Sequence, residues 1–412
     1  MIPPVPFRLA GIASPDPALS DPARSRPLAG LTLLESNAAD SPIALRLANS
    51  FAGRLFADLG AQVIKLEPWA GDPVRKSPPL LPARLPDGAP ASALFEFLNC
   101  GKQGLRMPAE PGAALETLLA GKVDGLLAEA GDPALALARA RGIPSLELTG
   151  FPIQAGPSVQ SLPFSEFTVL AFAGMLDMIG DPAREPLRLG GHQPAYAAGM
   201  AGFTALAALL LGREQGMAVE HARVSLVETM LWVNWKAVSG AQAQGRAPTR
   251  RGAQAEFQVL RCVDGWIALV FTMTQFDAVV ALLGNPVLRE PRFATRESRM
   301  RHGAELNTLL TPWFAARSRA DIYAKAQALG VPLGPVFDPA ELLGDAQHQA
   351  REFITTMAHP RLGELRMPRL PVLWGEQGFA PVALRELGLA LDPTLDAARN
   401  AALDPQPRGE PP

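Results

Sequence analysis

Strand-like and helix-like segments alternate along the first part of the chain, and this alternation leaves few possible folds. The segments 30–36 and 61–68 are short and largely apolar, as expected for strands, and 103–107 is also strand-like. Residues 43–60 carry Leu and Phe at helical spacing and end on Gly60, a favourable residue after a helix. A strand, a helix and a strand in this order form a βαβ unit, so the sequence predicts a parallel sheet.

The same pattern continues with helices predicted at 111–121 and 132–142 and strands at 123–129 and 144–151. This order is typical of a Rossmann-like α/β domain. No GxGxxG motif opens any of these helices, so the sequence does not indicate a dinucleotide. The sequence also has no P-loop, HExxH motif, CxxC pair or GxSxG elbow.

A second, smaller α/β region is predicted further along the chain. Residues 197–240 are interpreted as a helical hairpin, and 245–256 as a polar linker. The segment 258–271 predicts a pair of strands that turn at Asp264 and Gly265. Helices follow, and residues 359–374 return to extended character.

Charge and cysteine content exclude several classes of function. The 412 residues have a net charge of -2 and a pI near 6.3, which argues against a nucleic-acid partner. Cys100 and Cys262 lie far apart without metal-ligand spacing, so we predict no metal site. Such sparse cysteine use fits a reducing cytoplasm, where we expect the protein to reside.

We predict neither an export signal nor a membrane span. The first 27 residues contain prolines where a signal peptide needs an apolar core. The longest apolar run, 197–211, is interrupted by glycines and stops before Arg213 and Glu214. It is too short for a confident span, so we interpret it as a buried helix of a soluble protein.

Several sequence segments between residues 28 and 375 together resemble the conserved segments of one known family. They include FADLGAQVIKLEPWAGDPVRK (56–76), FLNCGKQGLRM (97–107), LTGFPIQAGP (148–157), AALLLGREQGMAVEHARVSLVET (207–229) and GVPLGPVFDPAELLGDAQHQAREF (330–353). In this order the blocks resemble the class III CoA-transferase family, also called the CaiB/BaiF family.

The resemblance implies an α/β fold in which both chain ends build a Rossmann-like large domain and a small α/β domain is inserted between them. It also implies that two monomers interlock as a dimer. We accordingly expect four parts of the chain: a flexible arm at 1–28, the N-terminal part of the large domain at 29–240, the small domain at 250–345, and the C-terminal return with its tail at 346–412.

The resemblance further implies transfer of CoA between an acyl-CoA and a carboxylic acid. A carboxylate attacks the thioester, forms a mixed anhydride and releases CoA thiolate, which then attacks again. Backbone N–H groups stabilise the oxyanion. In the family this carboxylate is an Asp four residues before a helix glycine, and counting back from Gly199 gives Ala195. No Asp or Glu occurs in residues 186–213, so we predict that Ala195 replaces the nucleophile.

A second carboxylate of the family is kept. Counting eight residues back from Gly174 gives Glu166, which is our candidate catalytic residue, as a polar partner or a substitute nucleophile. The alternative role is structural, because Ser165 and Glu166 suit the first turn of a helix. Ser165 and Ala195 stand at the His and Asp positions of the related α-methylacyl-CoA racemases, which disfavours racemase activity.

The CoA phosphates need cations and polar donors. The candidates for CoA binding are Arg75, Lys76, Lys102 and Asn99, with solvated surface charge as the alternative reading. His192, beside two glycines, is interpreted as a hydrogen-bonded loop residue rather than a catalyst.

Three hypotheses remain open from the sequence. The first is a CoA-transferase that uses Glu166 or an unrecognised nucleophile. The second is a catalytically silent subunit that pairs with an Asp-bearing paralogue. The third is an acyl-CoA-binding module. The sequence leaves open the identity of the acid and the choice between homodimer and heterodimer.

Overall fold

The computed structural model describes residues 26–86, 88–160, 162–218, 220–245, 250 and 257–389. These residues divide between two compact units. The large unit takes its residues from Met1–Ile179, Pro186–Pro248 and Phe353–Pro412, and the small unit from Gly180–Glu185 and Thr249–Glu352. Most of the predicted arm (1–28), most of the linker (245–256) and the tail from 390 lie outside the described residues.

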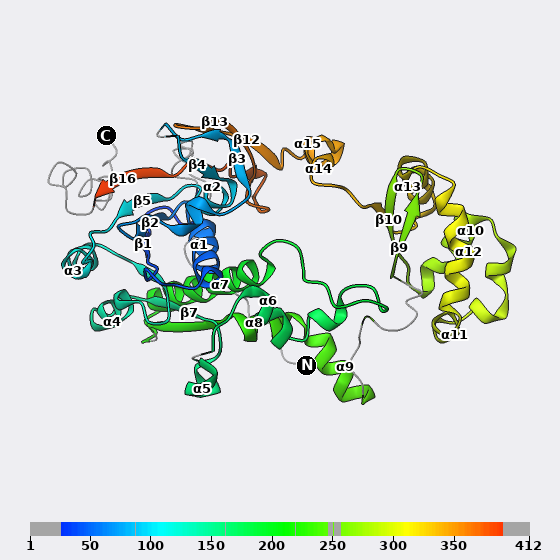
Figure 1. Ribbon diagram of the computed structural model, residues 1–412, viewed down its shortest axis with the longest axis horizontal. Coiled ribbons are helices and arrows are strands. Elements are labelled where there is room, and N and C mark those ends of the chain that lie inside the picture. The colour runs from blue at the N-terminus through cyan, green and yellow to red at the C-terminus, as the bar shows by residue number, and fades with distance from the viewer. Residues whose placement is uncertain are drawn as a thin grey trace. The chain divides into compact units, whose positions relative to one another are not determined.

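A seven-stranded sheet forms the centre of the large unit, in the order β16-β5-β2-β1-β6-β7-β8. All six neighbouring pairs are parallel. The strands are β1 (Thr32–Glu35), β2 (Gln62–Glu67), β5 (Gln103–Arg106), β6 (Gly125–Glu129), β7 (Ser145–Thr149), β8 (His221–Ser225) and β16 (Arg385–Leu389). Figure 1 shows β16, close to the end of the chain, beside β5.

The predicted parallel sheet is confirmed, and β1, β2, β5, β6 and β7 all lie inside the predicted strand ranges. The helical hairpin predicted at 197–240 is wrong in its middle, because His221–Ser225 forms the edge strand β8. The sequence HARVS alternates polar and apolar residues over only five positions, and most of its side chains are only partly buried. An edge strand needs no continuous apolar run, so the pattern did not reveal it.

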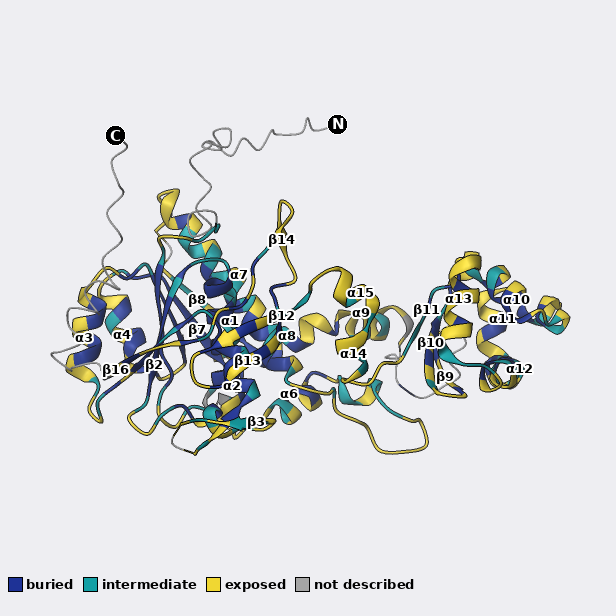
Figure 2. Ribbon diagram, turned by 90° about the horizontal axis from the view of Figure 1, so that it is seen from above, coloured by how far each residue is buried: buried dark blue, intermediate teal, exposed yellow. Residues whose placement is uncertain are grey.

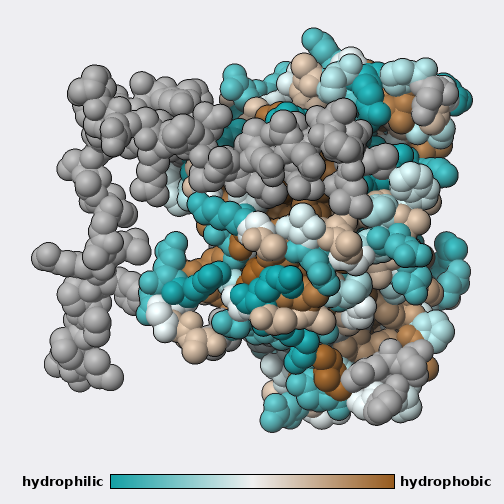
Figure 3. All heavy atoms as spheres, turned by 90° about the vertical axis from the view of Figure 1, so that its left-hand side faces the viewer, coloured by the Kyte–Doolittle hydropathy of each residue, from teal (hydrophilic) through white to brown (hydrophobic). Residues whose placement is uncertain are grey.

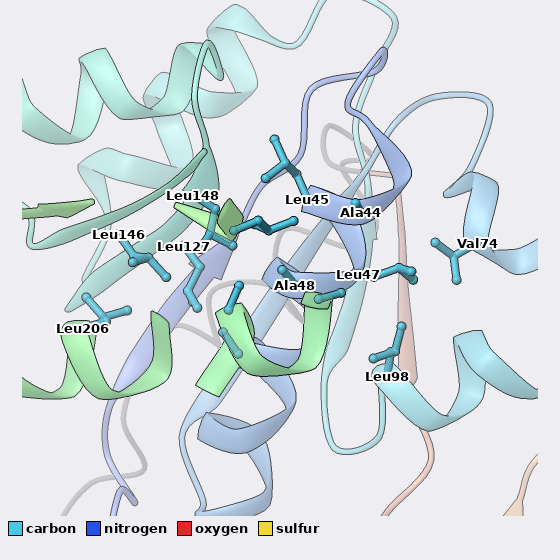
Figure 4. Close-up of a cluster of buried hydrophobic side chains, with 14 of the residues drawn as sticks. Ala44, Leu45, Leu47, Ala48, Val74, Leu98, Leu127, Leu146, Leu148 and Leu206 are labelled. Carbon is cyan, nitrogen blue, oxygen red and sulfur yellow. The ribbon is translucent and has the colours of Figure 1, made fainter. Parts of the chain in front are cut away.

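Helices cover both faces of this sheet. On one face, Leu33 and Leu127 pack with α1 (Ile43–Asp58) and α7 (Gln193–Glu214). Figure 4 shows this cluster, including Leu206 of α7. On the other face, Leu34 packs with α3 (Gly112–Ala120) and α4 (Pro133–Ala140), whose buried sides Figure 2 shows in blue. Successive strand residues point to opposite faces, so one strand serves both cores.

The helix α7 packs closely against the rest of the large unit through small residues. A Cβ atom at Gly199 would lie 2.7 Å from the carbonyl oxygen of Ala48 on α1, so only glycine fits at this crossing. By length and composition, α7 is the one described helix able to cross a membrane, with 33% of its most apolar window buried. The close contact between α7 and α1 at Gly199 holds the first turns of α7 beside α1.

The rest of the large unit consists of shorter elements. They are β3 (Leu80–Arg84), β4 (Pro90–Ser92), α2 (Ala93–Leu98), α5 (Pro157–Gln160), α6 (Glu166–Phe172), α8 (Leu226–Val233), α9 (Trp235–Gln244), β12 (Ile354–His359), β13 (Gly363–Pro368), β14 (Leu373–Trp374) and β15 (Gln377–Gly378). Seen from the side of α3 and β16, hydrophilic residues intermix with small hydrophobic patches (Figure 3).

The small unit has its own sheet and core. Its antiparallel sheet has the order β11-β10-β9, and the predicted turn at Asp264 and Gly265 is confirmed. The elements are β9 (Phe257–Cys262), β10 (Gly265–Val270), α10 (Phe276–Leu283), α11 (Arg296–Arg301), α12 (Gly303–Ala315), α13 (Arg319–Leu329), β11 (Leu333–Pro335), α14 (Glu341–Gly344) and α15 (Ala346–Ala350). A separate cluster of buried side chains, among them Ile267 and Phe314, holds it together.

Candidate active site

Glu166 is the first residue of α6, and its neighbours fix the start of that helix. The Ser165 hydroxyl accepts a hydrogen bond from the Thr168 backbone N–H at 3.3 Å. The Ser165 N–H in turn donates to the Thr168 hydroxyl at 2.8 Å, which completes a capping box. The prediction that Ser165 and Glu166 occupy a first helical turn is therefore confirmed.

The side chain of Glu166 reaches from α6 to the beginning of α7. Its Oε2 lies 2.5 Å from Nδ1 of His192, the residue that precedes α7, and its Oε1 accepts the backbone N–H of Ala195 at 3.2 Å. The N-terminus of a 22-residue helix stabilises a nearby carboxylate. The Glu166 and His192 side chains are 16% and 30% exposed, so both remain partly accessible to water.

Ala195 is the third residue of α7, and its methyl group is fully buried in the core. Its neighbour Tyr196 packs with Phe51 and Phe97, at ring-centroid distances of 4.8 Å and 6.1 Å. Burial raises the pKa of Tyr196, and the nearby negative charge of Glu166 raises it further. The Glu166 carboxylate thus lies at the backbone of Ala195, next to an aromatic cluster.

Two of the four residues predicted to bind CoA are buried. The Lys102 ammonium group donates to Glu35 at 2.6 Å, to the Ser50 carbonyl at 2.7 Å and to Asn99 at 3.0 Å. These bonds use all three ammonium hydrogens. Asn99 also donates to the Phe95 carbonyl at 2.9 Å. Both side chains therefore take part in internal packing, and in this conformation both are buried away from any phosphate at the surface.

The other two predicted CoA residues lie in the 3-10 helix η2 (Pro73–Lys76), after β2. Arg75 forms ion pairs with Glu67 at 2.6 Å and Glu386 at 2.7 Å, and its guanidinium stacks on the Phe95 ring. Lys76 is exposed. The structure therefore does not gather the four predicted residues into one exposed cationic site.

Lys102 belongs to a buried ionic cluster that the sequence reasoning missed. Lys65 contacts Glu35 and Asp72, each at 2.8 Å. Burial opposes ionisation of Glu35, but the charges of Lys102 and Lys65 outweigh that effect and lower its pKa to about 2. The only signal in the sequence was Lys65, which stands between apolar residues in the strand segment VIKLE.

The pairing of His192 with Glu166 was also missed, since 26 residues separate them. His192 is hydrogen-bonded, as predicted, but its partner is the candidate catalytic carboxylate. Cys100 and Cys262 are both buried free thiols. Within the described ranges, no three His, Cys, Asp or Glu side chains gather into a group able to hold a metal ion.

Comparisons with known proteins agree with this fold. The family described as CoA-transferase family III matches residues 43–124 and 134–383. A succinate–glutarate CoA-transferase from Agrobacterium fabrum is 26% identical over 350 residues, which cover 80% of this chain and 85% of that protein. The BbsE subunit of succinyl-CoA:(R)-benzylsuccinate CoA-transferase from Thauera aromatica is 29% identical over 360 residues, 79% of this chain and 85% of the subunit.

A solved structure gives the same result. The crystal structure of a CaiB/BaiF family protein from Brucella suis superimposes with a TM-score of 0.72 at 25% identity, and the match covers 92% of this chain and 99% of that one. The match to the family extends over most of the chain and includes α6 and the start of α7. The chain therefore belongs to CoA-transferase family III, the class III or CaiB/BaiF family that its sequence resembles.

Proposed function

We propose that the protein moves CoA between an acyl-CoA and a carboxylic acid, with Glu166 as the carboxylate that accepts the acyl group. In this proposal Ala195 occupies the position of the family's nucleophilic Asp. The main support is the 3.2 Å hydrogen bond from the Ala195 N–H to Glu166, because it brings a carboxylate to the residue that lacks one. Relatives named as CoA-transferases for succinate, glutarate and D-citramalate support the reaction class.

The geometry is compatible with the two halves of CoA transfer. A Glu166 oxygen attacks the thioester carbonyl, and the C–S bond breaks to leave a mixed anhydride and CoA thiolate. The thiolate then attacks the Glu166 carbonyl, which releases the first acid and leaves a glutamyl-CoA thioester. The second acid repeats these steps in reverse. The N-terminus of α7, with the Ala195 N–H, lies where negative charge develops on the Glu166 oxygens.

A trapping experiment tests this role. The purified chain is incubated with succinyl-CoA or acetyl-CoA, hydroxylamine is added, and the peptides are analysed by mass spectrometry for a hydroxamate on Glu166. We expect the label in the wild type and in Glu214→Gln, which changes an exposed glutamate at the far end of α7. Glu166→Gln should lose it. A label on another residue, or CoA binding without any label, contradicts the proposal.

The alternative is a catalytically silent subunit that pairs with a second, Asp-bearing chain. One observation favours it. Large apolar side chains are exposed on α6, α8 and α9, including Phe172 at 57%, Trp232 at 80% and Trp235 at 58%. Exposed apolar surface of this kind marks a protein–protein contact. The BbsE relative is itself named as a subunit.

The same trapping experiment separates the two functions. A silent subunit binds acyl-CoA without a label on Glu166, and CoA transfer appears only when an Asp-bearing partner chain is added. A homodimer that transfers CoA by itself excludes this alternative.

A further inference from the structure

We propose that His192 is a second catalytic residue of CoA transfer, whose Nδ1–H stabilises the negative charge that forms on a Glu166 oxygen when the Glu166 carbonyl is attacked. The inference rests on the proposed function, in which Glu166 accepts the acyl group. It gives His192 a role in the steps whose reacting carbonyl belongs to the protein itself, so the donor is identified without a bound substrate.

Two of the four steps of transfer take place at the Glu166 carbonyl carbon. In the first step a Glu166 oxygen attacks the thioester, and the C–S bond breaks to give a mixed anhydride and CoA thiolate. In the second the thiolate attacks the Glu166 carbonyl carbon, the bond to the bridging oxygen breaks, and the first acid leaves. In the third the second acid attacks the same carbon and expels the thiolate, which in the fourth attacks the new acyl group and restores the carboxylate.

The structure holds each oxygen of the Glu166 carboxylate with a different donor. Oε2 lies 2.5 Å from Nδ1 of His192, whereas Oε1 accepts the Ala195 backbone N–H at 3.2 Å. A carboxylate only accepts hydrogen bonds, so Nδ1 carries the hydrogen. The longer contact with a neutral amide leaves Oε1 as the freer nucleophile. Oε2 then stays on the protein as the carbonyl oxygen through the second and third steps.

The contact between His192 and Oε2 lies where negative charge develops in those two steps. When a thiolate or a carboxylate adds to the Glu166 carbonyl carbon, an electron pair moves onto Oε2, which changes from a neutral carbonyl oxygen to an oxyanion. A donor in contact with Oε2 binds the oxyanion more strongly than the neutral oxygen, so it lowers the barrier. In the first and fourth steps the charge forms on a substrate oxygen instead, so these steps do not need His192.

Both side chains are held in place by the ends of helices. Glu166 follows the Ser165 cap at the start of α6, and His192 directly precedes α7, where its carbonyl accepts the Tyr196 N–H at 2.9 Å. The His192 and Tyr196 rings also meet edge to face, with 6.2 Å between their centroids. A donor that is already positioned costs no reorganisation at the moment of reaction, as oxyanion stabilisation requires.

Another histidine–carboxylate pair of the large unit shows how a structural contact differs. His221 lies 2.9 Å from Glu147, but Arg139 and Arg223 also contact that carboxylate, at 2.6 Å and 2.8 Å. Burial raises the pKa of Glu147, but the hydrogen bond and charge of Arg223 outweigh this effect and lower it. Two permanent charges thus neutralise Glu147. Among the described residues, Glu166 forms no ion pair with an arginine or lysine, so its negative charge is not neutralised in this way.

The test follows the first two steps separately in the purified full chain, with succinyl-CoA and no acceptor acid. Samples quenched at timed intervals are analysed by mass spectrometry for glutamyl-CoA at Glu166, which reports the second step. We expect His192→Leu and His192→Ala to form glutamyl-CoA on the order of 100-fold more slowly than the wild type, because one oxyanion donor is lost. His192→Asn keeps an N–H near the position of Nδ1 and should recover most of the rate.

The first step is measured with hydroxylamine, which intercepts the mixed anhydride as succinyl hydroxamate. After subtraction of the background seen with Glu166→Gln, this rate should be nearly the same in the wild type and in the His192 variants. The matched control is His221→Leu, which removes the histidine of the structural pair on β8 and should behave like the wild type in both measurements. Thermal unfolding checks that each variant is folded.

The outcomes distinguish the two proposals. If the wild type forms glutamyl-CoA at Glu166 and His192→Leu or His192→Ala forms it at the same rate, the inference on His192 is overturned and the role of Glu166 stands. An equal loss in both steps also overturns it, because His192 then supports the site as a whole. If the wild type forms no glutamyl-CoA and no succinyl hydroxamate above background, the proposed function fails and the inference fails with it.

Discussion

Glu35 and Glu166 are carboxylates of the same unit, and each contacts a basic side chain. Glu35 lies fully buried between Lys65 and Lys102, at 2.8 Å and 2.6 Å. Glu166 contacts His192 at a partly exposed position. Every ammonium hydrogen of Lys102 is used, whereas Nε2 of His192 has no hydrogen-bond partner among the described residues. The Glu35 carboxylate is held inside the core by two lysines, whereas the Glu166 carboxylate keeps some contact with solvent.

Glu129, at the end of β6, is a third glutamate of the large unit that can be compared with Glu35 and Glu166. It is buried like Glu35, but its side chain forms no ion pair among the described residues. Burial, together with the nearby charge of Asp132, raises its pKa to about 7. Glu35 has its pKa lowered to about 2. Burial raises the pKa of both carboxyls, and at Glu35 the charges of Lys102 and Lys65 outweigh that effect. Replacing each glutamate with glutamine compares the three environments directly.

We expect the largest effect from Glu35→Gln. The change leaves two buried ammonium groups facing a neutral amide, so unfolding should cost about 3–5 kcal/mol less than in the wild type. Urea unfolding followed by circular dichroism measures the loss. As a control, Lys325→Gln breaks an exposed pair with Asp321 and should change stability by no more than about 0.5 kcal/mol. A loss below ~1 kcal/mol for Glu35→Gln contradicts its structural role.

Glu129→Gln should have an intermediate effect that depends on pH. The folded carboxyl has its pKa raised from 4.5 to about 7, so the folded state binds the proton more tightly than the unfolded state does. The wild type therefore loses stability as the pH rises from about 4.5 to 7, and glutamine has no such loss. Relative to the wild type, the variant should gain about 2 kcal/mol more at pH 8 than at pH 5 in urea unfolding. An equal effect at both pH values refutes the shift.

Glu166→Gln should have the smallest effect on stability. The side chain is partly solvated, and glutamine still accepts the Ala195 N–H, so the free energy of unfolding should change by less than ~1 kcal/mol. The same protein should lose the hydroxylamine label. Thermal unfolding of the variant beside the wild type checks the first point. A loss above ~2 kcal/mol would place Glu166 with Glu35 as a structural residue.

The sequence predicted the central sheet well because five of its strands are short apolar runs separated by helices or turns. It missed β8, whose polar edge residues resemble a loop between helices. Counting from Gly174 and Gly199 identified Glu166 and Ala195, but not the hydrogen bond that joins them across 29 positions. Lys102 was taken for a phosphate ligand because charge alone does not reveal burial. That distinction requires knowing that Glu35 faces it from β1.

The pairing of β16 with β5 also has a consequence for how the protein is made. The ribosome releases Gln103–Arg106 early, but the strand that covers its outer edge, Arg385–Leu389, emerges much later. At ~5–20 residues per second, that interval lasts on the order of tens of seconds. Throughout it the backbone N–H and C=O groups on the outer edge of β5, the side away from β2, remain unpaired and able to bind strands of other chains. The outer edge of β5 is therefore exposed to pairing with other chains for longer than an edge whose partner strand follows closely in the sequence.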